Sequence, residues 1–579
     1  MKLEQFKEVW VLDFEFGEKD PGIPRPLCLV AKELNQNKKI RLWLDEQGWA
    51  DSPFKISTDV LLVAYFATAE LSCFLELGWK FPEKLLDLYV EFRNLTNGLN
   101  PPLGNGLLGA MSFFGLSHID SADKETMRAL ALEGGPYTLK EKTDLLDYCQ
   151  SDVLATEALL EKMVGLIDVD RALIRGEYIK ALSQIERRGI PIDKKIFMNL
   201  KENWEGIQDL LIKEIDQDFN VFEGKTFKRE RFEEYLNYEG ISWPRLDTGI
   251  IDLKDETFRA MSKKHPKISP LRELRHSLSK MRLNEFPVGS DGRSRIMLSP
   301  FRSKTGRNQP SSSRFIFGSS VWLRGLIKPV EGRGLAYIDW SQQEFGIAAG
   351  LSGDQKMISA YKSSDPYLSF AKLAGQAPEN ATKQSHSKER SLFKATVLAV
   401  QYGMGAKSLS ESISVPLEEA KHLLWLHKKT FSKFWEWSES CVNYALTSRK
   451  LWTTFGWRLN LSGRVNPRSL ANFPMQANGA EMLRFAIIFM IKDGIKVCAP
   501  VHDAVLIEAP LEELEAKVKK AQYLMAKASR LVLNEFELKT DAELIQYPER
   551  FTDQERGQVF WDTVMRLLQK IKENKVSQN

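Results

Sequence analysis

The stretch Leu335 to Phe345 reads LAYIDWSQQEF, and it decides how the rest of the chain is interpreted. Its apolar start, up to Ile338, predicts a short buried strand. The strand ends on the carboxylate of Asp339, and a helical pattern begins near Glu344. An acid at the end of a buried strand lies at the rim of a core, where it can hold a metal ion and stay solvated. Such an acid is more often a helix cap or a turn residue, so a metal-binding role requires a second acid and a basic helix elsewhere.

The composition allows several globular domains and argues against a membrane-spanning or disulfide-stabilised protein. At 579 residues the chain is long enough for about three or four domains. Its formal net charge of +4 is small for this length, so any basic surface for an anionic partner has to be local. The five cysteines are scattered without a CxxC pair, which predicts buried, reduced thiols. We expect no signal peptide, no membrane span and a cytoplasmic location.

Acidic residues recur in three segments of the N-terminal part. On a predicted strand, Asp13 and Glu15 are two residues apart and so share one face. Two carboxylates about 4 Å apart repel by roughly 4 kcal/mol at an effective dielectric near 20, which a bound cation would offset. An exposed edge strand with an acidic face is the alternative. Glu70 lies near the start of a helical pattern, and Tyr148 and Asp152 share one face of a long amphipathic helix.

These segments resemble the DEDD-type 3′–5′ proofreading exonuclease with a tyrosine, whose first motif is Asp-x-Glu and whose third is Tyr-x-x-x-Asp. The second motif usually ends in an aspartate, whereas YFATAE places Glu70 there and leaves Asp87 as a further candidate. The resemblance implies an RNase H-like domain over residues 1–175 and two-metal phosphodiester hydrolysis. Tyr148 would orient the attacking water. The implied metal ligands are Asp13, Glu15, Glu70, Asp87 and Asp152.

A change of module follows at residues 178–193, YIKALSQIERRGIPID, where a helical pattern ends. This segment resembles the start of the polymerase part of family A DNA polymerases, and the charged helical region after it resembles their thumb. Arg275 and Lys280 are candidates for phosphate contacts there, and a solvated charged face is the alternative. In SKTGRNQPSSSRF, Arg307 and Arg314 are candidates for contacts beside the primer–template minor groove, and an ordinary flexible loop is the alternative.

The opening stretch also resembles a family A motif. DWSQQEF at residues 339–345 is similar to polymerase motif A, Asp-Tyr-Ser-Gln-Ile-Glu-Leu. The resemblance implies that Asp339 binds both catalytic metals and that the backbone carbonyl of Trp340 adds an oxygen ligand. Glu344 would lie under the sugar of the incoming nucleotide and exclude a 2′-hydroxyl. Gln342 is a further candidate for nucleotide contact.

A basic helix is predicted at KERSLFKATVLAVQYGMG. Residues at intervals of four line one face of a helix. The residues at that spacing are Arg390, Lys394, Leu398 and Tyr402. The stripe resembles motif B of the fingers, in which the two cations grip the nucleotide triphosphate. Leu398 stands where Phe or Tyr is usual, which bears on sugar discrimination.

Two further segments resemble family A motifs. The spacing of RSLANFPMQ is similar to Arg-x3-Asn-x-Pro-Met-Gln, whose side chains would reach minor-groove acceptors that are nearly the same for every base pair. Helix capping by Asn472 is the alternative. KVCAPVHDAVLIEAP predicts a hairpin and resembles motif C, His-Asp-Glu, with Ala504 in place of the glutamate. The resemblance implies a second polymerase metal ligand, Asp503. The implied nucleic-acid contacts are Arg468, Asn472, Gln476 and His502.

The order of these motifs resembles compact, phage-type family A enzymes, and we expect no 5′-nuclease domain. The implied fold is a combination of α/β and α+β domains, with an RNase H-like exonuclease domain followed by a polymerase domain shaped like a right hand with palm, fingers and thumb. The expected divisions are an exonuclease-like domain (1–175), thumb and entry (176–300), palm with motif A (301–350), fingers with motif B (351–450), and palm with motif C and the C-terminal region (451–579).

The resemblance implies template-directed addition of dNTPs to primer–template DNA during replication, with 3′–5′ proofreading. Each active site would use two Mg²⁺ ions, with Mn²⁺ as an alternative. We expect it in the cytoplasm of a bacterial or phage-infected cell, with a replisome helicase or processivity factor as candidate partner. The alternatives are a single-subunit RNA polymerase-like enzyme, a catalytically silent primer–template binding protein, and a nuclease whose polymerase half only holds DNA.

Overall fold

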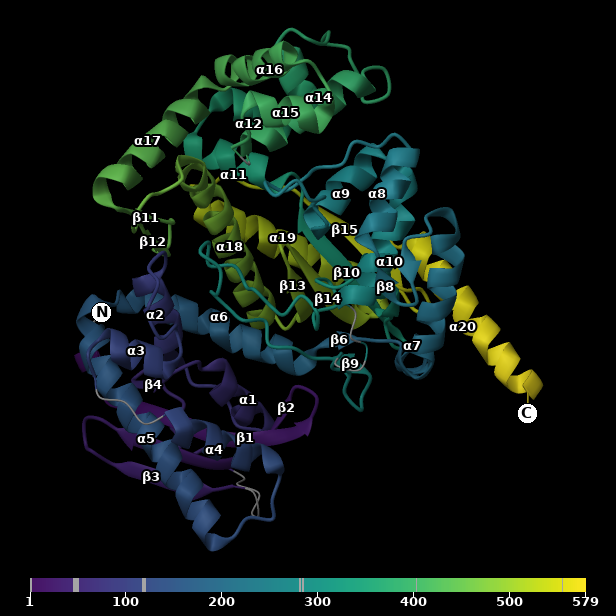
Figure 1. Ribbon diagram of the computed structural model, residues 1–579. Coiled ribbons are helices and arrows are strands. Elements are labelled where there is room, and N and C mark those ends of the chain that lie inside the picture. The colour runs from purple at the N-terminus through teal and green to yellow at the C-terminus, as the bar shows by residue number, and fades with distance from the viewer. Residues whose placement is uncertain are drawn as a thin grey trace.

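The computed structural model describes residues 3–44, 51–116, 121–280, 283, 286–401, 403–554 and 556–578. Figure 1 shows an N-terminal α/β body at the bottom, in purple and blue, below a central sheet. A group of green helices, α14 to α17, lies above that sheet, and teal-blue helices α7 to α10 lie to its right. The last helix extends outward beside α7.

The N-terminal body is built on a mixed five-stranded sheet in the order β3-β2-β1-β4-β5. Strands β1, β2 and β3 pair antiparallel, while β4 and β5 continue the sheet parallel to β1. Alternate residues of β1 belong to two cores, since Leu12 joins the cluster containing α1 and Val11 joins the one containing α5. The bounds are β1 (Glu8–Asp20), β2 (Ile23–Glu33), β3 (Lys39–Trp43), β4 (Val60–Ala64), β5 (Lys84–Asp87), α1 (Thr68–Glu76), α2 (Leu88–Thr96), α3 (Leu107–Phe113), α4 (Ser121–Glu133) and α5 (Leu139–Met163).

A second, antiparallel sheet has the order β13-β14-β10-β15 and joins three distant segments of the chain. The predicted strand and hairpin are confirmed as β10 (Arg333–Trp340), β13 (Lys496–Val501) and β14 (Ala504–Pro510), and β15 (Thr540–Gln546) completes the sheet. Gly334 faces Leu514 of α19 (Leu514–Val532). Alternate strand residues share a face, so Trp340, like Gly334, points toward the α19 side of the sheet. Asp339 points toward the opposite side.

The remaining helices surround this sheet. The predicted boundary at residue 175 falls inside a continuous helix, α6 (Val169–Arg188), which contacts both β5 and β13 and so bridges the two bodies. The other helices are α7 (Lys194–Ile215), α8 (Arg229–Tyr238), α9 (Asp255–Lys264), α10 (Ser269–Lys280), α11 (Gln343–Ser352), α12 (Gln355–Lys362), α13 (Pro366–Leu373), α14 (Ser387–Gln401), α15 (Ala406–Ile413), α16 (Leu417–Thr430), α17 (Ser432–Ser448), α18 (Pro467–Lys492) and α20 (Gln558–Gln578). The short strands are β6 (Ile190–Pro191), β7 (Phe222–Glu223), β8 (Thr226–Phe227), β9 (Arg293–Ser294), β11 (Lys450–Trp452) and β12 (Arg458–Asn460).

Within the described ranges, no helix combines the length and apolar character needed to cross a bilayer.

A buried ion pair holds α2 against α6. Arg175 donates two hydrogen bonds to the Glu91 carboxylate, at 2.6 and 2.7 Å, and both side chains are more than nine-tenths buried. We expect Glu91→Ala to reduce the free energy of unfolding by about 3–5 kcal/mol, because it leaves a buried guanidinium without its carboxylate. Glu418→Ala, which removes an exposed ion pair with Lys421, should cost less than about 1 kcal/mol. Urea denaturation followed by circular dichroism measures both; equal effects would contradict the prediction.

Candidate active sites

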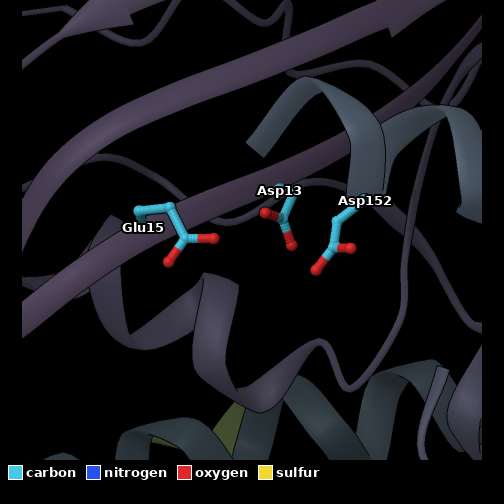
Figure 2. A group of neighbouring side chains, drawn as sticks. All are labelled: Asp13, Glu15 and Asp152. Carbon is cyan, nitrogen blue, oxygen red and sulfur yellow. The ribbon is translucent and has the colours of Figure 1, made fainter. Parts of the chain in front are cut away.

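The first site lies at β1 and α5 of the N-terminal body. Three acids meet here: Asp13, Glu15 and Asp152. Each contributes one carboxylate oxygen, and these three oxygens all lie within 4.8 Å of one another. Figure 2 shows Asp13 and Glu15 on the same strand, with Asp152 on the neighbouring helix. The predicted shared face of Asp13 and Glu15 is therefore confirmed. Oxygen donors gathered in this way fit Mg²⁺, which prefers carboxylate ligands.

Helix α5 brings its tyrosine into the same site. The Tyr148 hydroxyl donates a hydrogen bond of 3.2 Å to Asp152 Oδ2, one helical turn away. The Cys149 thiol contacts the Asp13 carbonyl at 3.1 Å, which fixes α5 against β1. Burial and the neighbouring Asp152 charge raise the pKa of Tyr148, so the residue is a neutral phenol at physiological pH.

Glu70, on the first turn of α1, is the fourth acid near this site. Its side chain is 5% exposed, and its Oε2 atom is buried without a hydrogen-bond partner. Burial first, and then the Asp13 charge, raise the pKa of Glu70 well above its usual range. A cation among these acids would remove both penalties, because it would supply an electrostatic partner for the buried carboxylate.

Asp87 has a different role from the one considered in the sequence. Its carboxylate accepts hydrogen bonds from the backbone N–H groups of Phe66, Ala67, Tyr89 and Val90, at 2.9 to 3.3 Å. It is the N-cap of α2, where an acid satisfies exposed backbone donors. Because these amides occupy the carboxylate, the structure favours a capping role over the predicted metal-ligand role.

The second site lies at one end of the central sheet. Asp339 is at the end of β10 and pairs in register with Ala504, so Asp503 in the β13–β14 turn lies beside it. Burial, followed by the Asp503 and Asp541 charges, raises the pKa of Asp339 to about 6. Burial also raises the pKa of Asp503. Two half-buried carboxylates with only oxygen donors fit the predicted binding of Mg²⁺.

The rest of the predicted motif A is divided between the core and the site. The Trp340 side chain is 1% exposed, so only its backbone can contribute to the site. Gln342 is exposed and precedes α11 in a left-handed conformation, with φ of 46°. Glu344 is in the first turn of α11. Burial is the main cause that raises the pKa of Tyr367, and the charge of the nearby Glu344 raises it further.

Helix α14 carries the predicted basic stripe. The Arg390 guanidinium lies 5.7 Å and the Lys394 ammonium 6.0 Å from the centre of the Tyr367 ring, within cation–π range. Arg390 also donates a hydrogen bond to Asp365, which caps α13. The structure therefore brings both predicted phosphate-binding residues to one aromatic platform. Leu398 is half-buried on the same helix, and Tyr402 lies outside the described residues.

Helix α18 presents the predicted minor-groove residues at intervals of four. Arg468 is exposed, and Asn472 and Gln476 are half-buried. The N-cap of this helix is Asn466, whose side chain accepts a hydrogen bond from the Arg468 N–H at 3.0 Å. Asn472 lies inside the helix, so the alternative of capping by Asn472 is wrong.

The loop with Thr-Gly-Arg lies beside the β13–β14 turn. Arg307 and His502 line the same cavity of about 220 Å³. The positive charge of Arg307 is close enough to Asp503 to favour the ionised carboxylate and so oppose the rise in its pKa. Arg484 of α18 donates a hydrogen bond of 2.8 Å to the Gly306 carbonyl, and Asn97, just beyond α2, donates one of 2.7 Å to the Lys304 carbonyl. The loop is thus anchored from two bodies. Arg314, farther along, is exposed.

Arg275 is half-buried and packs against aromatic rings in the α8–α10 region. Its guanidinium lies 4.3 Å from the centre of the Phe227 ring and 4.0 Å from that of Phe258, and it donates to the Leu253 carbonyl. Burial lowers the pKa of Arg275 to about 10. These contacts favour a packing role over the predicted phosphate contact. Lys280 is the last residue of α10.

Sequence reasoning did not single out Asp541 or Tyr367. Asp541 lies opposite Asp339 in the β10–β15 register, although the two are distant in sequence. A signal was present, because Asp541 and Glu543 are two residues apart on a strand, like Asp13 and Glu15. For Tyr367 the sequence offers only a neighbouring acid and proline, which predict a helix start rather than a platform.

The chain is similar to DNA polymerases over most of its length. Residues 312–545 match the family described as DNA polymerase family A. DNA polymerase I of Aquifex aeolicus is 24% identical over 69% of this chain and 74% of its own length, and the DNA polymerase of Mycobacterium phage D29 is 23% identical over 67% and 66%.

A solved structure is similar over nearly the whole chain. It is the POL domain of Pol1 from M. smegmatis in complex with DNA primer–template and dNTP, with a TM-score of 0.70 and 17% identity. The match covers 95% of this chain and 96% of that one, which shows a shared fold. The match to DNA polymerase family A thus covers residues 312–545, the part of the chain that contains Asp339 and Asp503.

Proposed function

We propose that this protein is a template-directed DNA polymerase that adds dNTPs to a primer 3′ end, and that a separate site removes nucleotides in the 3′–5′ direction. The observation that carries the proposal is the placement of Asp339 and Asp503 side by side at the end of the central sheet. The basic helix α14 and the named DNA polymerase relatives support it. The proposed setting is DNA replication in a bacterial or phage-infected cell.

In this proposal each part of the fold has a conventional polymerase role. The sheet β13-β14-β10-β15 forms the palm, α12 to α17 the fingers, and α7 to α10 the thumb. The N-terminal body is an RNase H-like exonuclease domain, because its mixed sheet places Asp13 and Glu15 on the central strand β1.

Each site has residues to hold two divalent ions. Asp339, Asp503 and the Trp340 carbonyl would hold them at the polymerase site. Bound Mg²⁺, or Mn²⁺ in its place, would supply the nucleophile activation and charge neutralisation of two-metal phosphoryl transfer. At the exonuclease site the proposed ligands are Asp13, Glu15, Glu70 and Asp152.

The other residues bind and orient the reactants. Arg390 and Lys394 would neutralise the triphosphate, so Arg390 exchanges its Asp365 partner for phosphate when a nucleotide enters. Glu344 would exclude a 2′-hydroxyl. At the exonuclease site, the Tyr148 phenol would orient the attacking water beside Asp152. Base choice would come from pairing with the template, checked by the α18 residues and by Arg307.

A single primer-extension experiment tests the proposal. A labelled primer on a longer template should lengthen with dNTPs and shorten when no nucleotides are added. Ribonucleotides in place of dNTPs should give little product, whereas a single-subunit RNA polymerase would extend the chain with them. Binding without lengthening or shortening would favour the silent binding protein. Shortening alone would favour the nuclease whose polymerase half only holds DNA.

Leu398 offers a test of nucleotide selection on α14. We expect Leu398→Tyr to ease dideoxynucleotide incorporation by at least about tenfold relative to the dNTP, because a phenol hydroxyl can replace the missing 3′-hydroxyl contact. Leu398→Phe is the matched control, since it adds the ring without the hydroxyl. Single-nucleotide incorporation with each substrate gives the ratio. If the two variants select alike, the hydroxyl explanation is wrong.

A further inference from the structure

The polymerase aspartate on β10 has an acid directly across the sheet. Strand β10 lies between β14 and β15, and Asp339 pairs with Ala504 on one side and with Asp541 on the other. Residues directly opposite in antiparallel strands put their side chains on one face, with Cβ atoms about 4.5–5.5 Å apart. Asp541 therefore lies beside Asp339 on the face that carries the polymerase site.

The neighbour of Asp339 on the other side, Ala504, carries no acid. The resemblance to motif C places a glutamate at position 504, where this chain has a fully buried alanine. We propose that Asp541 is the third carboxylate of the polymerase metal site, supporting Mg²⁺ binding beside Asp339 in place of that missing acid. The proposal rests on the proposed polymerase function, since it assigns a residue to the same site.

The direction of the Asp541 side chain supports this assignment. Its Oδ2 atom accepts a hydrogen bond from the Ser341 hydroxyl, two residues beyond Asp339. Ser341 is itself fixed, because its N–H donates to the Lys539 carbonyl at 2.9 Å and its carbonyl accepts from the Tyr361 hydroxyl at 2.9 Å. The carboxylate is thus hydrogen-bonded to the side chain of Ser341, the residue that follows Trp340, whose backbone carbonyl is a proposed metal ligand.

The face of the sheet that carries Asp339 holds several carboxylates close together, which the pairing of β10 with β15 does not require. Like charges directly opposite each other destabilise a strand pair. Here Asp339 and Asp541 are directly opposite each other, and Asp503 is adjacent to Asp339. A divalent cation offsets such repulsion, whereas a purely structural role for Asp541 would be met as well by asparagine.

Four variants separate the charge of Asp541 from its hydrogen bond with Ser341. Asp541→Asn removes the charge but keeps an oxygen that can accept from Ser341. Ser341→Ala removes the hydrogen bond but keeps the charge. Asp541→Glu keeps the carboxylate, and Glu543→Gln is the matched control, because it removes an exposed acid from the same face of β15.

The measurement is the Mg²⁺ dependence of dNTP binding to the full chain on a dideoxy-terminated primer–template, which allows binding without chemistry. We expect Asp541→Asn to raise the Mg²⁺ midpoint by about tenfold, the scale found when a residue supporting a metal ligand is lost. Asp541→Glu and Glu543→Gln should stay within about threefold of the unmodified chain.

Three results would overturn the inference. They are an unchanged Mg²⁺ midpoint for Asp541→Asn, an equal shift for Glu543→Gln, and a full shift for Ser341→Ala without one for Asp541→Asn. Thermal unfolding of each variant separates these results from misfolding. Primer extension by the unmodified chain is scored separately: if it extends and Asp541→Asn binds Mg²⁺ normally, only this inference fails. If the unmodified chain does not extend a primer, the proposed function itself fails.

Discussion

Replacing Asp339 by asparagine should reduce primer extension at least about 10²–10³-fold, the scale of removing one preorganised charge from an active site. Asp339 lies at the end of a strand paired on both sides, so the backbone around it is fixed by β14 and β15. Asparagine has nearly the same shape, and the change therefore removes the charge without opening a cavity. DNA binding should remain within a few-fold, because phosphate contacts elsewhere hold the duplex.

Single-turnover extension measures this effect, with DNA affinity determined in parallel. The 3′–5′ degradation of the same variant is an internal control, since the exonuclease acids lie on β1, α1 and α5 of the N-terminal body. Degradation at the normal rate shows that the N-terminal body is folded, and unchanged DNA affinity shows the same for the polymerase part. Extension at the unmodified rate would remove Asp339 from the metal site.

The sequence predicts local relationships well in this chain. Asp13 and Glu15 share a face because strand residues alternate, and Tyr148 and Asp152 meet because helix residues four apart are neighbours. The strand before Asp339 was predictable from its apolar run. In each case the contact follows from the geometry of a single element, so no knowledge of the tertiary fold is needed.

The roles that sequence reasoning missed depend on contacts between distant elements. Arg275 packs against Phe227 and Phe258, and the sequence does not reveal that these rings lie beside the arginine. Asp87 caps α2 by accepting from the Tyr89 and Val90 amides, and its carboxylate is fully occupied because the 66–67 turn adds two further amides. Asp541 joins Asp339 only through the pairing of β15 with β10. Such pairings are non-local, and a charge pattern alone does not reveal them.

Replacing Asp13 by alanine should remove 3′–5′ degradation and leave extension unchanged. Asp13 and Glu15 both lie on the central strand β1, and the charge of Asp13 also raises the pKa of Glu70. Losing Asp13 would remove one of the carboxylates that hold the ions, so we expect degradation to fall at least about 10²-fold. Degradation of a mismatched, labelled primer without nucleotides measures the rate.

Glu18→Ala is the matched control for this experiment, because Glu18 is an exposed acid on the same strand β1. It should degrade the primer like the unmodified chain. Normal degradation by Asp13→Ala would contradict the metal assignment. If the unmodified chain itself fails to degrade the primer, Glu70 becomes the cause to test, since its carboxylate is one methylene longer than the usual aspartate. Glu70→Asp should then gain activity, because the shorter side chain restores the ligand of the second motif beside Asp13 and Asp152.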